Sequence, residues 1–225
     1  MAYISYGAHR PECNTNRVCH EVLEAATKAI EAGAEIVNIA FKFQTEYGIW
    51  NNIGIQLKYA FAAKLSSSVQ QPAYSYHHTG PVMSFFSASL GNLISEATLD
   101  PEGGLPSTML TFDTPVGVLC VITTSLPRIP SRTRARLLNF YDNAAMKTNA
   151  DCMLIGGSLD DLDELTKLSL QTQVANLRLD FKLAINSDLY VLARGANCTL
   201  GRSLSGPNNL TSNLVFKTVF PGPQC

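Results

Sequence analysis

The stretch that decides the fold is Ala150-Asp151-Cys152-Met153-Leu154-Ile155-Gly156-Gly157-Ser158-Leu159-Asp160-Asp161. The run from Cys152 to Ile155 is short and apolar, which is typical of a strand buried on both faces. We expect Gly156-Gly157 to end this strand. Acidic residues follow at Asp160, Asp161, Asp163 and Glu164. A strand that delivers acids to its carboxyl end is a common way to build a site in an α/β protein. The simpler interpretation is a turn followed by the acidic first turn of a helix.

The bulk composition indicates a globular chain with a sizeable core. The sequence has 225 residues, of which 46% are hydrophobic and 16% are charged, so we expect one domain spanning residues 1–225. The net charge of −1 provides no global basic field to attract nucleic acid. The sequence shows neither an apolar run of the roughly 20 residues that cross a bilayer nor a secretory signal. We therefore predict an intracellular protein, cytoplasmic or nuclear, without membrane association.

The cysteines support the same interpretation. The six cysteines are spread too widely for a small disulfide scaffold. Cys120 and Cys152 lie inside apolar runs and are expected to be buried core thiols. We therefore predict that the cysteines are reduced.

Hydrophobic periodicity predicts alternating strands and helices. The first unit is a strand at Tyr3–Ala8, a helix at Arg17–Glu31 that ends at Gly33, and a strand at Glu35–Phe41. This strand–helix–strand order indicates a crossover with both strands in one sheet.

The later elements alternate in the same way. They are predicted as a helix at Asn52–Ser66, strands at Val82–Leu90 and Asn92–Ala97 (the second separate or a continuation of the first), a β-hairpin of Thr108–Phe112 and Val116–Thr123, helices at Ser131–Asn149 and Leu159–Thr172, and strands at Leu189–Ala193 and Asn213–Phe220. The segment Tyr74–Gly80 is expected to be a surface loop. Its adjacent His77 and His78 would point in opposite directions on an extended segment, so they are not predicted to form a bidentate site.

The order of these elements, with four short segments, resembles the endonuclease/exonuclease/phosphatase superfamily, which has the DNase I-like fold. Gly33-Ala34-Glu35-Ile36-Val37 looks like the entry to the family's second strand, and Val121–Leu126 looks like the segment that usually ends in Thr-His-Leu. Cys152–Asp160 looks like the strand that ends in Gly-Asp-Phe-Asn, and Thr211–Val215 looks like the terminal Ser-Asp-His strand. The resemblance implies an α/β (α+β) fold, in which a two-sheet β-sandwich is flanked by helices in four layers.

The resemblance also implies a metal-dependent phosphodiesterase or phosphomonoesterase. That chemistry needs a carboxylate to hold Mg²⁺, an Asp/Asn pair to position the nucleophile and phosphate, and a His–Asp pair for proton transfer. Position by position, other residues stand in these places. The first-strand Asn falls at Gly7, the metal-binding Glu at Phe41 and the middle His at Ser125.

The last two motifs are altered in the same way. In the Gly-Asp-Phe-Asn motif, the Asp becomes Ser158 and the Asn becomes Asp160; in the terminal motif, the Asp becomes Ser212 and the His becomes Asn213. Phe41 in place of a carboxylate removes an oxygen ligand that Mg²⁺ requires, and the loss of both histidines removes the usual base with a pKa near neutrality. The leading hypothesis is a non-catalytic relative without metal or cofactor, which serves in binding, structure or assembly with protein partners or with copies of itself.

The alternative is an active Mg²⁺-dependent nuclease or phosphatase with relocated residues. It would use Glu46, Asp160, Asp161 and a histidine. The simpler interpretation is that Glu46 is an exposed loop acid and that the two aspartates face solvent at a helix N-terminus.

A cluster of arginines is the remaining candidate site. Arg128, Arg132, Arg134 and Arg136 fall close together, and on a helix Arg132 and Arg136 share a face. They are candidates for contact with phosphate, nucleic acid or an acidic partner. The simpler interpretation is a solvated helix face.

Overall fold

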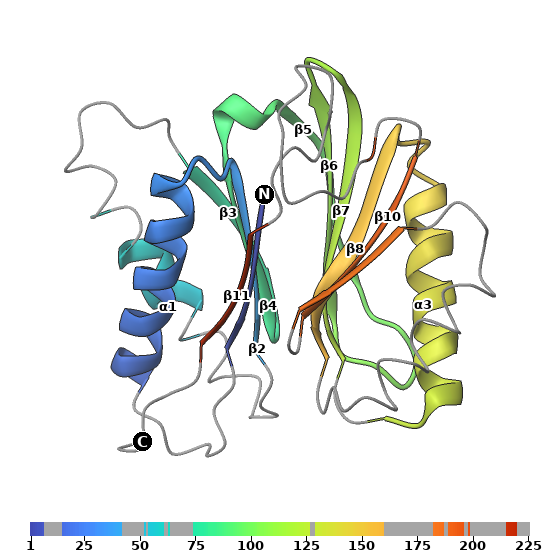
Figure 1. Cartoon of the computed structure of the whole chain (residues 1–225), viewed down its shortest axis with the longest axis horizontal. Coiled ribbons are helices and arrows are strands. Elements are labelled where there is room, and N and C mark those ends of the chain that lie inside the picture. The colour runs from blue at the N-terminus through green and yellow to red at the C-terminus, as the bar shows by residue number, and fades with distance from the viewer. Residues whose placement is uncertain are drawn as a thin grey trace.

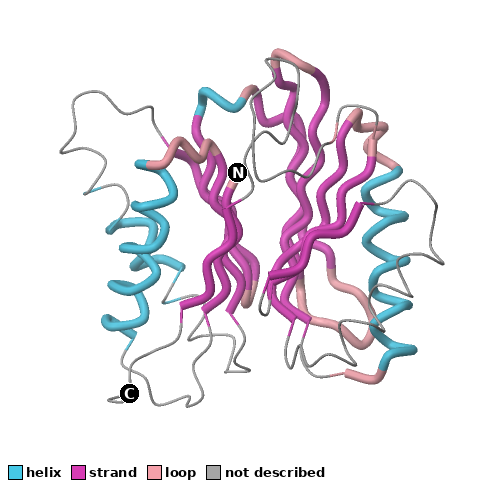
Figure 2. Tube along the Cα trace, viewed as in Figure 1, coloured by secondary structure: helices cyan, strands magenta, loops and turns pink. Residues whose placement is uncertain are grey.

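The structure, a computed structural model, describes residues 1–6, 15–41, 52, 54–60, 63, 74–126, 129–159, 182–186, 189–195, 198 and 215–219. Within these residues the strands form two sheets that pack face to face, and a helix covers the outer face of each sheet (Figures 1 and 2). The predicted two-sheet β-sandwich flanked by helices is therefore confirmed.

The first sheet carries α1 (Thr15–Glu31) on its outer face. Its five described strands have the order β11 (Val215–Val219), β1 (Ala2–Tyr6), β2 (Ile36–Phe41), β4 (Val82–Ser87) and β3 (Tyr74–Thr79). Strand β1 pairs in parallel with β11 and with β2, whereas β4 is antiparallel to β2 and β3. The predicted crossover through α1 is confirmed, because β1 and β2 are parallel neighbours.

Gly33 ends α1 as predicted. It has a φ of 92°, a left-handed conformation that favours glycine. The N–H groups of Ala34 and Gly33 donate to the carbonyls of Ala29 (3.0 Å) and Ile30 (2.9 Å). This is the Schellman arrangement, which satisfies the last carbonyls of the helix.

The second sheet carries α3 (Ser131–Met146) on its outer face. Its six described strands have the order β5 (Asn92–Leu99), β6 (Ser107–Thr114), β7 (Gly117–Leu126), β8 (Cys152–Leu159), β10 (Leu189–Arg194) and β9 (Lys182–Asn186). Strands β6 and β7 form the predicted hairpin, and β7 is parallel to β8.

Apolar side chains fill three layers. One layer lies between α1 and the first sheet, one between the two sheets, and one between the second sheet and α3. In the middle layer the rings of Phe86 and Phe112 meet edge to face with centroids 5.1 Å apart. Alternation along each strand divides its side chains between two of these layers.

Strand β8 is longer than predicted, because it continues through both glycines to Leu159. A Cβ at Gly156 would lie 2.6 Å from the carbonyl oxygen of Tyr190, and one at Gly157 would overlap the carbonyl oxygen of Thr124. The glycines therefore permit close approach to the neighbouring strands instead of forming a turn. The predicted helix at Leu159–Thr172 lies outside the described residues beyond Leu159.

The segment Tyr74–Gly80 was predicted to be a loop, but Tyr74–Thr79 is strand β3. Its histidines point in opposite directions, as expected. His77 Nδ1 lies 3.2 Å from Glu96 Oε2 in β5, whereas His78 Nε2 lies 3.1 Å from the carbonyl oxygen of Gly80. Each ring thus has a local structural partner.

The connection after β4 shows whether Val82–Leu90 and Asn92–Ala97 form one strand or two. A short 3₁₀ helix, η1 (Ala88–Leu90), carries the chain from β4 in the first sheet to β5 in the second, so the two predicted strands are separate. The predicted helix at Asn52–Ser66 is confirmed over residues 54–60. No helix in the described part of the chain is long and apolar enough to span a membrane.

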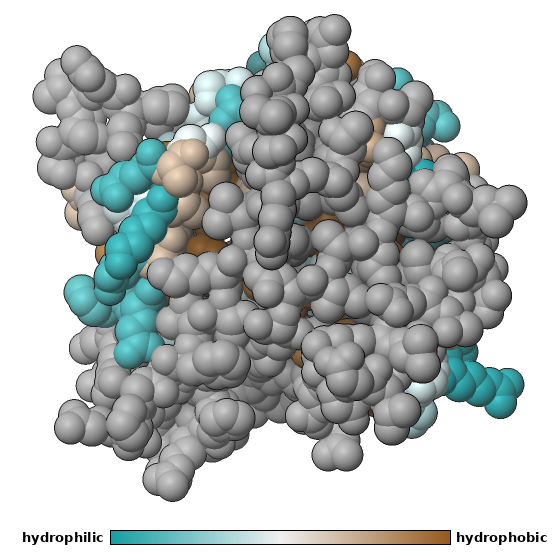
Figure 3. Space-filling model, in the orientation of Figure 1, coloured by the Kyte–Doolittle hydropathy of each residue, from teal (hydrophilic) through white to brown (hydrophobic). Residues whose placement is uncertain are grey.

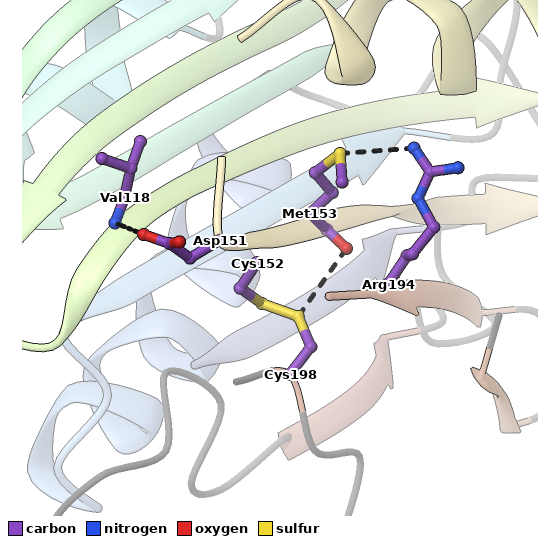
Figure 4. The surroundings of a disulfide bond; sticks show 6 residues. All are labelled: Val118, Asp151, Cys152, Met153, Arg194 and Cys198. Carbon is purple, nitrogen blue, oxygen red and sulfur yellow. Dashed lines mark hydrogen bonds between the residues drawn. A yellow bond between two sulfur atoms is a disulfide. The ribbon is translucent and has the colours of Figure 1, made fainter. Parts of the chain in front are cut away.

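The prediction for Cys152 is wrong, because this residue forms a disulfide with Cys198. Figure 4 shows the bridge connecting the start of β8 to the segment that follows β10. The apolar run around Cys152 concealed this pairing, since its partner comes 46 positions later. Cys120 is a buried free thiol, as predicted.

Candidate functional site

The carboxyl ends of the two parallel strand pairs meet at one end of the sandwich. Strands β1 and β2 run toward the lower end in Figure 1, and so do β7 and β8. Ser125 near the end of β7 donates a hydrogen bond of 2.6 Å from Oγ to the carbonyl oxygen of Phe41 at the end of β2. We call this end the mouth and define it by Phe41, Ser125 and Ser158.

A chain of hydroxyl groups joins three strands at the mouth. Ser158 lies opposite Ser125 in the parallel pair of β7 and β8. Its Oγ donates to Ser125 Oγ over 3.1 Å, and Ser125 in turn donates to Phe41. The exposed fractions of Ser158 and Ser125 are 0% and 3%. Both hydroxyls are therefore committed to neutral hydrogen bonds between strands and across the two sheets.

A second uncharged network lies deeper between the sheets. Asn38 Oδ1 accepts hydrogen bonds from Ser84 Oγ (2.7 Å) and from Thr123 Oγ1 (3.0 Å). Asn38 and Ser84 belong to the first sheet, whereas Thr123 belongs to the second, and all three are fully buried. Such a network fixes the relative position of the sheets because each buried polar group needs its partner.

Phe41 does not point into the mouth. Its ring packs on the α1 side of the first sheet, with its centroid 6.1 Å from that of Tyr6. Asn38 faces the other sheet, so Ala40 shares that inward face by strand alternation. Only the backbone carbonyl of Phe41 contributes to the mouth. The signal in the sequence for this orientation is the period-two pattern of Glu35–Phe41.

Several predicted site residues lie outside the described residues. These are Gly7, Glu46, Arg128, Asp160, Asp161, Ser212 and Asn213. Their roles remain predictions. Of the described residues that stand in the family's catalytic positions, Ser125 and Ser158 bring their side chains together, whereas Phe41 contributes only its backbone carbonyl.

The described arginines of the cluster separate into two groups. Arg132 and Arg136 are exposed on α3, and Arg136 Nη2 lies 3.5 Å from Glu102 Oε2. Arg134 is only 6% exposed, and its Nη2 donates to the carbonyl oxygen of Ile129 over 3.4 Å. Arg132 and Arg136 therefore share an exposed face, as predicted from their spacing, but Arg134 lies on the buried side.

The described residues at the mouth do not fit a magnesium ion. Mg²⁺ favours octahedral oxygen coordination that includes carboxylates, whereas the described side chains here are two engaged serine hydroxyls. Nowhere among the described residues do three or more His, Cys, Asp or Glu side chains gather to hold a metal. One nearby carboxylate, that of Glu21, lies on α1 outside the two sheets and is engaged there, because it accepts a 2.8 Å hydrogen bond from the Tyr6 hydroxyl. We derive no metal-dependent step from this arrangement.

Ser125→Ala tests the hydroxyl chain. We expect it to lower the free energy of unfolding by about 1–3 kcal/mol, because it removes the hydroxyl that donates to the Phe41 carbonyl and accepts from Ser158. Ser158→Ala should cost only about 1 kcal/mol, since Ser125 keeps its bond to Phe41. Urea denaturation of both variants measures the difference. Equal losses would show that Ser125 does not link the two sheets.

No protein-family model matches this sequence, and neither does any curated protein. Solved structures do match. D. rerio TDP2 complexed with single strand DNA product has a TM-score of 0.58 and 10% identity, with 88% of this chain and 85% of that chain covered. Truncated Caenorhabditis elegans TDP2 has a TM-score of 0.55 and 11% identity, with 85% and 83% covered.

A third match is an endonuclease/exonuclease/phosphatase family protein from Bacteroides thetaiotaomicron. It has a TM-score of 0.51 and 8% identity, with 85% of this chain and 82% of that chain covered. At such identities the likeness establishes the fold alone. The chain has the DNase I-like fold of the endonuclease/exonuclease/phosphatase proteins, as the sequence resemblance implied.

Proposed function

We propose that this chain is a non-catalytic phosphoesterase-like domain that serves as a binding, structural or assembly component. The observation that supports this most is the hydrogen-bonded chain from Ser158 through Ser125 to the Phe41 carbonyl. The strand ends that resemble the family's histidine and aspartate motifs carry neutral hydroxyls here. A catalytic base must reach its substrate with a free lone pair, whereas these hydroxyls are buried and face one another.

Activation of either serine as a nucleophile is also unsupported. A serine hydroxyl needs an adjacent base to become an effective nucleophile. Within the described part of the chain, the hydrogen bonds of Ser125 and Ser158 go to each other and to a backbone carbonyl, with no carboxylate or imidazole among them. This arrangement favours a structural role for the mouth.

The exposed faces of the helices supply the proposed binding surfaces. In Figure 3, hydrophilic side chains gather over α1 and beside the start of α3. Arg132 and Arg136 on α3 are suited to an acidic protein partner or to a second copy of the chain. Because one structural neighbour is complexed with single strand DNA product, single-stranded DNA is the nucleic acid to include in binding tests.

A hydrolysis assay tests the proposal against the alternative of relocated residues. The full chain would be incubated with DNA, RNA and bis(p-nitrophenyl) phosphate in Mg²⁺ or Mn²⁺. We expect no more hydrolysis than with Asp160→Ala, because the described side chains at the mouth are hydroxyls and offer no carboxylate to a metal ion or a water molecule. Glu31→Gln, which changes an exposed acid on α1, is the matched control. Turnover that disappears in Asp160→Ala but persists in Glu31→Gln would establish an enzyme instead.

A further inference from the structure

A cavity of about 640 Å³ lies between the second sheet and the C-terminal half of α3. It borders β5, β6 and α3, on the side of the sheet that faces this helix, whereas the mouth lies between the two sheets. Its volume falls within the range of about 300–1,000 Å³ that is typical of small-molecule sites.

The wall of the cavity is largely apolar. It is formed by Ile94 and Leu99 from β5, Met109 from β6, and Phe140 and Ala144 from α3. Ile94 is 57% exposed and Phe140 is 39% exposed, although both are large apolar side chains. An apolar ligand would remove this surface from water, which is favourable in proportion to the apolar area buried. The wall therefore favours an acyl or aryl group.

The polar groups that line the cavity include two threonine hydroxyls. Thr111 is 2% exposed, and its Oγ1 makes no hydrogen bond within the described part of the chain. Thr148 Oγ1 donates to the carbonyl oxygen of Ala145 over 2.6 Å and keeps a lone pair. A buried hydroxyl without a hydrogen-bond partner destabilises the folded chain. An oxygen atom of a ligand would satisfy Thr111.

The nearby Cys120 thiol does not act as the hydrogen-bond partner of Thr111. Burial raises the pKa of Cys120 to about 11, although the hydroxyls of Thr148 and Thr111 partly offset that rise. The thiol is therefore neutral at physiological pH. Thr111 lies close enough to the thiol to lower its pKa, but the geometry leaves Thr111 Oγ1 without a hydrogen-bond partner among the described residues. The Thr111 hydroxyl thus remains to be satisfied.

Lys147 supplies the charge. Lys147 lies just beyond α3 and is exposed. Among the described residues that line the cavity, it is the one with a formal charge. It forms no ion pair within the described part of the chain. An ammonium group beside an apolar cavity favours an anionic head group on a ligand whose body is buried.

We infer that this cavity binds a small amphipathic monocarboxylate. The acyl or aryl body packs against the apolar wall, the carboxylate pairs with Lys147, and Thr111 hydrogen-bonds to a ligand oxygen. This site is separate from the mouth and does not depend on whether the mouth is catalytic.

Isothermal titration of the full chain with decanoate and with decylammonium tests the inference, with both probes kept below their micellar concentrations. We expect one saturable decanoate site per chain and an affinity about tenfold higher than that for decylammonium, a difference of ~1.4 kcal/mol. Lys147→Gln should remove this preference. Thr111→Val should weaken decanoate binding several-fold, since the hydroxyl is lost while the shape is kept.

Two cavity-filling variants and one control complete the experiment. Ala144→Trp on α3 and Ser95→Tyr on the exposed strand β5 should each abolish decanoate binding, and thermal unfolding checks that each variant is folded. Lys28→Gln, an exposed cation on α1, should bind like the unmodified chain. The inference is overturned by a lack of saturable binding, by equal affinity for decylammonium, or by unchanged binding in a folded cavity-filling variant.

Discussion

Replacing Cys152 and Cys198 by alanine is expected to lower the free energy of unfolding by about 4 kcal/mol. The two cysteines are 46 positions apart in sequence, with their Cα atoms 5.1 Å apart. Closing a loop of this length removes conformational entropy from the unfolded chain, which in the chain-entropy model amounts to ~4 kcal/mol at 25 °C. Urea denaturation under nonreducing conditions measures the change, provided that the dependence on urea concentration is compared between the proteins.

A reductant provides the internal control. It should destabilise the unmodified protein by a similar amount and leave the double variant unchanged. Cys120 is fully buried, and burial raises its pKa to about 11, so it should not react in the folded state. An unmodified protein whose unfolding midpoint ignores the reductant would contradict the disulfide.

The bridge also bears on where the protein resides. Disulfides persist in oxidising compartments and are rare where thiols are kept reduced. The Cys152–Cys198 disulfide contradicts the reduced state expected from the sequence, and the intracellular location stays a prediction. Counting free thiols in protein isolated under rapid alkylation is the direct check.

Asp142→Ala is expected to cost about 3–5 kcal/mol of folding free energy. Asp142 Oδ1 lies 2.9 Å from Arg194 Nη2, and the two side chains are 5% and 3% exposed. The pair links α3 to β10 beneath the helix. Removing the carboxylate takes a buried negative charge away from a buried guanidinium, which is more costly than losing the attraction alone. The guanidinium also contacts the Met153 sulfur, 3.5 Å from Arg194 Nη2.

The exposed pair of Arg136 and Glu102 is the matched control. These side chains are 67% and 91% exposed and 3.5 Å apart, so Arg136→Ala should cost at most about 1 kcal/mol. Urea denaturation of both variants gives the comparison. If Asp142→Ala and Arg136→Ala lower the free energy of unfolding by similar amounts, burial does not make the Asp142–Arg194 pair more important for stability than the exposed pair.

Most of the fold could be predicted because its elements carry local signals. The helical spacing before Gly33 and the paired apolar runs around Asp113-Thr114-Pro115 indicated the crossover and the hairpin. The predicted strand at β8 is too short because Gly156 and Gly157 locally favour a turn. The two glycines instead make room for the backbones of Thr124 and Tyr190, and this long-range contact leaves no local sequence pattern.

The candidate site was predictable only in outline. Parallel pairing indicated that the ends of β7 and β8 would meet, but the bond from Ser125 to the Phe41 carbonyl depends on how the two sheets pack. The Asp142–Arg194 pair and the disulfide connect residues 52 and 46 positions apart. Such contacts are set by tertiary packing and lack a periodic signal.

A titration of the full chain with Mn²⁺ tests whether the domain is non-catalytic. Mn²⁺ binding would be followed by electron paramagnetic resonance, which distinguishes free from bound ion. We predict no saturable site and the same titration for the unmodified chain, Asp160→Ala and Glu31→Gln. A single stoichiometric site that is lost in Asp160→Ala or Glu46→Gln and retained in Glu31→Gln would contradict it.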